Sequence, residues 1–194
     1  MTFSIVARCA RSGQFGIGIA SYTLAVGRYC DGAVRANTGA ALTLANPLPR
    51  NNYLAIDLLA QGRTAPQVLR ELLGDDPAHE YRQIALIDRD STAVAHTGNK
   101  TAAWSGHRSG AGYIVFGDGL AGEGVLAAMA QAFEKTADEG QDEQILAALE
   151  AGQAAGGLAG RKGTLPVRSA AIRSSTHARS RWVERVRCSN SARL

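Results

Sequence analysis

The sequence has few aromatic residues, few cysteines and no long apolar run. Aromatic residues make up 6% of the 194-residue chain, and Cys9, Cys30 and Cys188 are its three cysteines. Their odd number and their spacing, which is not that of metal ligands, favour reduced thiols and exclude a zinc motif. No apolar run approaches the roughly 20 residues that cross a bilayer, and Arg8 and Arg11 interrupt the only stretch that could begin a signal peptide. We therefore expect a cytoplasmic protein without a membrane contact, a metal or a cofactor.

Acidic residues are scarce only near the C-terminus. Residues 161–194 carry nine Lys or Arg and one acid, Glu184, whereas residues 1–160 carry 12 basic and 16 acidic residues. A basic surface attracts nucleic acid when the charges lie on one ordered face. Here they lie in one terminal stretch, so we expect no nucleic-acid partner.

Three β-hairpins are predicted from alternating apolar residues and turn residues. The first joins residues 3–7 to residues 15–21, the second covers 33–45 with a turn at 37–39, and the third joins 81–88 to 92–98. Gly16 and Gly18 in the first hairpin predict a close approach of another element. A further strand is expected at 112–117.

Four helices are predicted from apolar residues at helical spacing. We expect Asn52 to cap the first, which ends at Gly62, and Thr64 to cap the second, which ends at Gly74. Residues 121–137 and 142–155 form the other two.

The order of these elements predicts an α+β fold. Hairpins and helices come in blocks, which favours antiparallel sheets covered by helix pairs over a parallel sheet. A four-layer α-β-β-α sandwich over residues 1–172 satisfies this order. RSAAI at 168–172 begins a last strand, which we expect to be incomplete. Residues 173–194 predict a basic, Ser/Arg-rich tail that is either disordered or the product of an altered reading frame.

Two sequence patterns suggest a functional site, but we expect each of them to have a structural role. GDGLAG at 117–122 fits a dinucleotide-binding motif, but a helix followed by another helix forms no βαβ unit, so we expect a structural turn. His96 and His107 could be combined with Asp88 or Asp118 as an acid–base set. With four histidines in the chain such pairings are easily drawn, and we expect both histidines to be structural or solvent-facing.

Thr2 is the candidate nucleophile. Its small side chain permits removal of Met1, which would leave a free α-amine on the threonine. That amine can take the proton of the threonine hydroxyl, so that one residue supplies both nucleophile and base. A strand that starts at Phe3 would hold the residue rigidly. Many proteins have Thr at position 2, however, so the residue alone does not decide.

The chain resembles a bacterial family, the domain of unknown function 1028 (DUF1028). The resemblance covers about residues 1–172 and rests on several motifs: MTFSIVAR, GIGIAS, LAVG, EYRQIALID, AHTG, WSGHR, LAGEGVLAAMAQAFE and LEAGQAAGG. It implies the α-β-β-α fold of the N-terminal nucleophile (Ntn) hydrolase-like superfamily, and it supports Thr2. Family members often have Thr-Gln near the end of the second hairpin, where this chain has LTLAN (42–46), and they continue with further structure after RSAAI.

Two functions follow as alternatives. The first is an Ntn-type amide-bond hydrolase of unknown substrate, small molecule or peptide, with Thr2 as nucleophile, Arg35 as a nearby cation for the oxyanion, and Asn46 as a hydrogen-bond donor. The second is a non-catalytic binding protein on the same scaffold, in which the helix pairs mediate oligomerisation. In both cases we expect a homo-oligomer.

Overall fold

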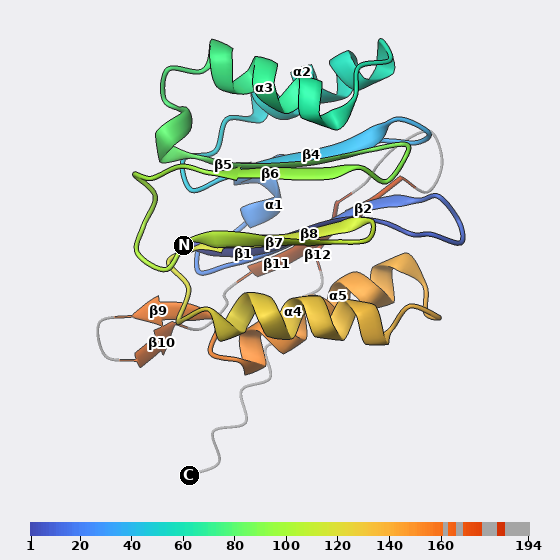
Figure 1. Ribbon diagram of the computed structural model, residues 1–194. Coiled ribbons are helices and arrows are strands. Elements are labelled where there is room, and N and C mark those ends of the chain that lie inside the picture. The colour runs from blue at the N-terminus through green and yellow to red at the C-terminus, as the bar shows by residue number, and fades with distance from the viewer. Residues whose placement is uncertain (161–162, 166–168, 176–181, 185–194) are drawn as a thin grey trace.

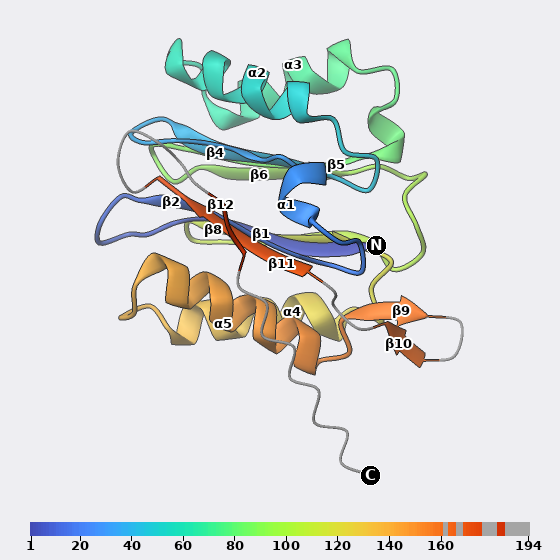
Figure 2. The same ribbon diagram turned by 180° about the vertical axis from the view of Figure 1, so that it is seen from behind.

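The protein is an α+β sandwich in a computed structural model that describes residues 1–160, 163–165, 169–175 and 182–184. Two antiparallel sheets face each other, one helix pair covers each outer face, and the short helix α1 (Val26–Tyr29) lies along one side between the sheets (Figures 1 and 2). The helices on both outer faces and the predicted antiparallel sheets are thus confirmed.

The larger sheet, sheet A, carries the N-terminus in an inner strand. Its strand order is β12-β11-β2-β1-β8-β7. The strands are β1 (Thr2–Arg8), β2 (Phe15–Ser21), β7 (Gly106–Gly110), β8 (Tyr113–Asp118), β11 (Ser169–Ser174) and β12 (Trp182–Glu184). Because β1 pairs with β2 on one side and with β8 on the other, its first residue is held from both sides.

The smaller sheet, sheet B, has the strand order β3-β4-β5-β6. Its strands are β3 (Ala33–Arg35), β4 (Gly39–Leu44), β5 (Gln83–Asp88) and β6 (Ala93–Thr97). The helices α2 (Pro49–Ala60) and α3 (Ala65–Asp75) cover sheet B, whereas α4 (Gly124–Lys135) and α5 (Gln141–Ala154) cover sheet A (Figure 1). A 3-10 turn, η1 (His79–Tyr81), and a small ribbon of β9 (Leu158–Gly160) and β10 (Gly163–Leu165) complete the described elements.

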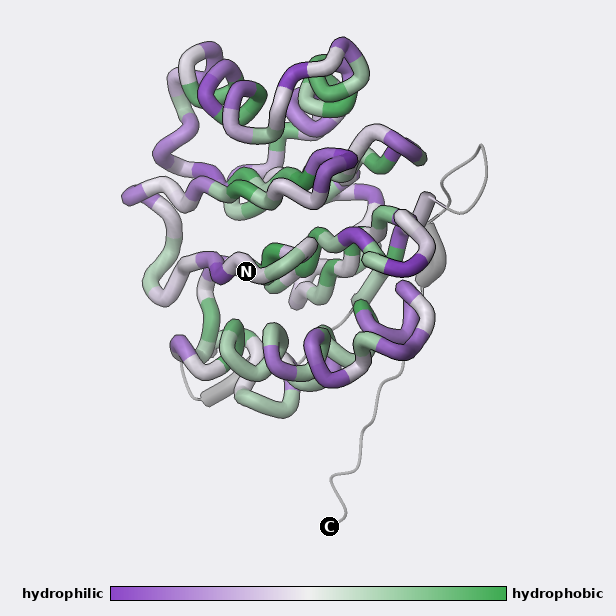
Figure 3. The backbone as a smooth tube through the Cα atoms, turned by 45° about the vertical axis from the view of Figure 1, so that its right-hand side comes forward, coloured by the Kyte–Doolittle hydropathy of each residue, from purple (hydrophilic) through white to green (hydrophobic). Residues whose placement is uncertain are grey.

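Alternation along the strands fills three apolar layers. In β1, Phe3, Ile5 and Ala7 pack against α4 and α5, whereas Val6 joins the cluster between the sheets. A third cluster joins sheet B to α2 and α3. Hydrophobic residues therefore concentrate along the strands, and the turns at the hairpin tips are hydrophilic (Figure 3). The inter-sheet layer is the one that matters for the candidate site.

Two of the residues predicted to start or end a helix do not do so in the structure. The helix expected to begin after Asn52 begins at Pro49, because proline has no N–H to leave unpaired in a first turn. Asn52 instead accepts a hydrogen bond from Thr43 and donates one to the Asp31 carbonyl. Thr64 does form the predicted cap, as part of a capping box with Gln67. Gly74, expected to end α3, lies inside it.

The sequence pattern missed β7 and underestimated the C-terminal strands. β7 reads GHRSG, which has no apolar alternation, so only its pairing with β8 makes it a strand. The last strand predicted to begin at residues 168–172 is β11, which continues to Ser174 and pairs with both β2 and β12. Arg173 donates to Asp31 and to the Gly32 carbonyl. The remainder of the expected tail, 176–181 and 185–194, lies outside the described residues, as does Cys188.

Gly18 confirms the expected close packing, and its replacement provides a test of the fold. A Cβ atom there would lie 2.3 Å from Cγ2 of Ile145 on α5, so α5 would have to move away from sheet A. We expect Gly18→Ala to lower the free energy of unfolding by about 1–3 kcal/mol. Gly74→Ala is the matched control: nothing lies within 4 Å of its Cβ position, and alanine favours a helix by about 1 kcal/mol over glycine. Urea unfolding of both variants measures the difference, and equal stabilities would contradict the packing.

Candidate functional site

A cluster of polar side chains lies at one end of the space between the two sheets. Thr2 pairs in register with Ser21 on β2 and with Asp118 on β8. Alternate residues of a strand point to the same face, and Val6, Ile19 and Phe116 belong to the inter-sheet cluster. On each of the three strands, the polar residue is separated from the cluster residue by an even number of positions. The three polar side chains therefore face the same inter-sheet space. All three residues are buried.

The Thr2 hydroxyl contacts Ser21 directly. The two hydroxyl oxygens lie 3.1 Å apart. Ser21 Oγ also donates to the Met1 carbonyl at 3.1 Å and accepts from the Thr23 N–H at 3.0 Å. Because the one hydroxyl proton of Ser21 goes to Met1, Thr2 is the donor in the Thr2–Ser21 hydrogen bond. The side chain of Thr2 thus has one defined orientation.

Asp118 lies beside the N-terminal amine. The Met1 amine is 3.6 Å from Oδ2 of Asp118. Burial raises the pKa of the Asp118 carboxyl above its ordinary value, although the N-terminal charge and the Thr2 N–H partly oppose this shift. Its other oxygen, Oδ1, is buried without a hydrogen-bond partner in the described part of the chain. A carboxylate held this way is poised to interact with an amine or a ligand.

Cys30, the residue that caps the C-terminus of α1, lies close enough to this cluster for the charge of Asp118 to act on it. Burial and, to a smaller extent, the negative charge of Asp118 raise the pKa of Cys30 to about 12. A thiol with such a pKa is protonated at neutral pH, so Cys30 is not an activated thiolate.

Sheet B contributes a second set of polar groups at the same end. Gln83 Nε2 donates to Thr97 Oγ1 at 3.1 Å and to the Gly106 carbonyl at 3.0 Å, which joins β5 to β7 across the two sheets. Thr97 Oγ1 lies 2.9 Å from Nδ1 of His107. Gly106 pairs with Gly117, which in turn pairs with Phe3. Gln83 therefore lies over the Thr2 end of sheet A.

Three buried polar atoms near Thr2 lack a hydrogen-bond partner among the described residues. They are Ser4 Oγ, Gln83 Oε1 and Asp118 Oδ1. Each is on a strand residue that faces the inter-sheet space. A buried polar atom without a partner costs free energy, so three such atoms at one end indicate a place where a ligand or ordered water completes the hydrogen bonding.

The structure does not bring the other two predicted site residues to Thr2. Arg35 pairs with Gly39 near the turn of the β3–β4 hairpin and lies 3.7 Å from Asp57 as an exposed ion pair. That turn is at the opposite end of the sheets. Asn46 follows β4 at the Thr2 end, but its side chain is exposed and its backbone carbonyl accepts a hydrogen bond from Arg82. Sequence reasoning missed Ser21 and did not join Asp118 to Thr2, because only the strand register shows both.

The remaining motif residues have structural roles. Gly119 of GDGLAG has a φ of 63°, and a Cβ there would lie 2.3 Å from Met1 Cγ, which supports the expected turn. Asp88 accepts from the N–H groups of Ala65, Asp90 and Thr92. Nε2 of His96 lies 3.3 Å from the His79 carbonyl.

Within the described residues, no group of three His, Cys, Asp or Glu is arranged to hold a metal, and no helix is long and apolar enough to cross a membrane.

Two surface pockets lie away from Thr2. One is on α3 and is lined by Arg63, Gln67, Arg70 and Glu71. Arg63 and Glu71 form an ion pair there, and Arg70 leaves the lining with a net charge of +1. The other lies at the opposite end of the inter-sheet space, against Arg8 and Phe15. Thr2 is therefore not at the floor of either pocket, and the groups around it are those of the inter-sheet polar cluster.

Fold and site together define an α+β sandwich protein with a polar cluster around the first residues of an inner strand. The chain belongs to the family of unknown function DUF1028, whose family model matches residues 2–192. The resemblance seen in the sequence is confirmed at the level of this family. The match includes the C-terminal stretch that was expected to be a separate tail.

A solved structure shows the same fold. The crystal structure of the protein SPO2555 from Silicibacter pomeroyi, also assigned to DUF1028, superimposes with a TM-score of 0.81 at 28% sequence identity. The aligned region covers 94% of this chain and 79% of that chain. The search of curated proteins gave no match.

Proposed function

We propose that the protein is an amide-bond hydrolase of the Ntn type, in which Thr2 is the nucleophile once Met1 has been removed. The observation that carries this proposal is the geometry around Thr2: its hydroxyl is oriented by Ser21, and the amine of the preceding residue lies 3.6 Å from the buried Asp118. After removal of Met1, the Thr2 nitrogen becomes the α-amine in the place where its N–H now meets Asp118.

Removal of Met1 would also release hydrogen-bonding groups. Ser21 would lose its acceptor, the Met1 carbonyl, so its hydroxyl proton could turn toward Thr2 or toward a developing oxyanion. Asp118 would exchange the Met1 amine for the Thr2 amine. The change thus converts a set of hydrogen bonds that holds Met1 into one that faces a substrate.

The proposed reaction has two steps. The Thr2 amine accepts the hydroxyl proton while the hydroxyl oxygen attacks the amide carbonyl carbon, and the C–N bond breaks as the proton passes to the leaving nitrogen. This gives an ester between Thr2 and the acyl group. Water then attacks the ester, which frees the carboxylic acid and restores the threonine. Asp118 holds the amine, as the third member of such a set does, and Ser21 supplies a hydrogen bond to the oxyanion.

The first test is the mass of the mature protein. We expect the protein purified from cells without an N-terminal tag to lack Met1, because the mechanism needs a free amine on Thr2. Intact mass spectrometry measures this directly, and the same sample is assayed against a panel of acyl amides. Turnover by protein that keeps Met1 would rule out Thr2 as the nucleophile.

A further inference from the structure

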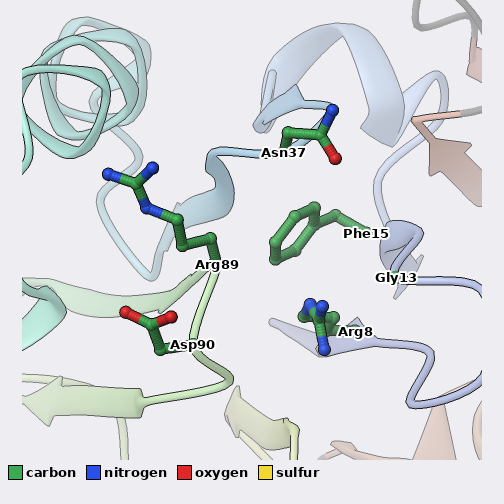
Figure 4. A pocket seen from close by; sticks show the side chains of 6 residues that line it. All are labelled: Arg8, Gly13, Phe15, Asn37, Arg89 and Asp90. Carbon is green, nitrogen blue, oxygen red and sulfur yellow. The ribbon is translucent and has the colours of Figure 1, made fainter.

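A second candidate site lies at the other end of the space between the sheets. Three hairpin turns meet there: residues 8–15 between β1 and β2, the β3–β4 turn with Asn37, and the β5–β6 turn with Arg89 and Asp90 (Figure 4). They enclose a pocket of about 280 Å³, lined by Arg8, Gly13, Phe15, Asn37, Arg89 and Asp90. We propose that this pocket binds the carboxylate or phosphate group of a small molecule.

Arg8 supplies a fixed positive charge at the base of the pocket. Its guanidinium lies over the Phe15 ring, 5.8 Å from the ring centroid, and its NH1 group donates to Ser91 Oγ at 3.0 Å. These contacts hold the guanidinium in place. Its Nε is buried without a hydrogen-bond acceptor within the described ranges. In that part of the chain no carboxylate forms an ion pair with Arg8, so its charge is available to an anion.

Arg89 contributes a second positive charge to the lining of the pocket. It is exposed on the β5–β6 turn, and within the residues the structure describes it forms no ion pair. Arg89 lines the pocket, and its guanidinium extends away from Phe15, on the same side as the Asp90 carboxylate (Figure 4). Two arginines against one aspartate give the lining a net charge of +1. Planar guanidinium groups suit carboxylate and phosphate oxygens in particular.

The other lining groups limit the rest of the ligand. Phe15 is fully buried and presents the only apolar side chain among the six lining residues, while the Asn37 amide can donate or accept a hydrogen bond. The volume of about 280 Å³ fits a small molecule with one anionic group rather than a polymer. Because Arg8 ends the strand that Thr2 begins, the pocket is about 20 Å from the nucleophile. It is therefore a site separate from that of the proposed hydrolysis.

The test is calorimetric titration of the full chain with sodium phosphate and, separately, with sodium acetate, at constant ionic strength set with sodium chloride. We expect saturable binding of one anion per chain. Arg89→Gln should weaken it at least about tenfold, because a charged hydrogen bond is lost. Arg50→Gln, a change of the same kind at an exposed site on α2, should leave binding unchanged. Arg8→Lys keeps the charge but loses the planar donor set, and it should also weaken binding.

The outcomes separate cleanly. Binding of phosphate alone assigns a phosphate group to the natural ligand, and binding of acetate assigns a carboxylate; either supports the site if Arg89→Gln weakens it. Absence of saturable binding of both anions overturns the proposal. Wild-type affinity in Arg89→Gln also overturns it, because Arg89 would then make no contribution to anion binding. An equal loss in Arg50→Gln overturns it as well, because that result would show only a general response to net charge. None of these outcomes depends on Thr2.

Discussion

Thr2→Ala should abolish amide hydrolysis by the mature protein and leave its fold intact. The substitution removes the proposed nucleophile, so only substrate positioning and oxyanion contacts would remain, and the rate should fall by several orders of magnitude. The hydroxyl is buried and bonded to Ser21, but Ser21 keeps its bond with the Thr23 N–H. The free energy of unfolding should therefore decrease by only about 1 kcal/mol.

Thr2→Ser is the matched control for this experiment. It keeps the hydroxyl and the α-amine and loses only a methyl group, so turnover should persist. All three proteins are compared on the same panel of acyl amides, after circular dichroism and intact mass have shown equal folding and equal removal of Met1. Equal turnover by wild type and Thr2→Ala would refute the mechanism. Absence of turnover by wild type on the whole panel would favour the binding-protein alternative.

Asp118→Asn should reduce turnover by about 10²-fold or more and should change its dependence on pH. A nearby carboxylate favours the protonated form of the Thr2 amine, and only the unprotonated amine can act as base. Removing the carboxylate should therefore move the rise of kcat/KM to lower pH, even as the maximum falls. Asp57→Asn is the control, since Asp57 is exposed and pairs with Arg35 away from Thr2. A pH profile in Asp118→Asn identical to that of wild type would contradict the role of Asp118.

The same variant should not lose stability at neutral pH. Burial raises the pKa of Asp118, so the folded state favours the protonated carboxyl more than the unfolded state does. For an acid of this kind, stability falls as pH rises from the ordinary pKa through the raised one, and the cost persists above it. Asparagine carries no charge and removes that cost. Urea unfolding at pH 7 should show Asp118→Asn to be at least as stable as wild type, which would distinguish loss of chemistry from loss of fold.

The layers of the fold could be predicted because they depend on local patterns. Alternation placed the three hairpins, and the Thr64 cap with Gln67 marked the start of α3. β7 could not be found in this way: GHRSG has no apolar residue, and its conformation comes from pairing with β8. Strand β11 looked incomplete for a similar reason, since its partners β2 and β12 lie on either side of it only in the folded chain.

The candidate site was only partly predictable because long-range register determines it. Thr2 was chosen as the candidate from its position and its chemistry. Asp118 and Ser21 reach it through strand pairings that no local pattern encodes. Arg35 was placed near Thr2 because it lies on a neighbouring hairpin, but the orientation of sheet B puts the turn of that hairpin at the other end of the molecule. Local sequence patterns thus specify strands, whereas the relative direction of two packed sheets follows from the whole chain.

The inner position of β1 has a consequence for the timing of synthesis. The strand that pairs with β1 on one side ends at Asp118, which leaves the ribosome 116 residues after Thr2. At a typical elongation rate this delay is on the order of ten seconds. During that interval neither Asp118 nor the β8 backbone is present to hold the N-terminus, so an aminopeptidase can reach Met1. Once sheet A closes, Met1 packs against Gly119 and its amine pairs with Asp118. Removal of Met1, if it occurs as proposed, would therefore compete with folding. Slower elongation would favour removal, whereas chains that refold rapidly before processing would keep Met1.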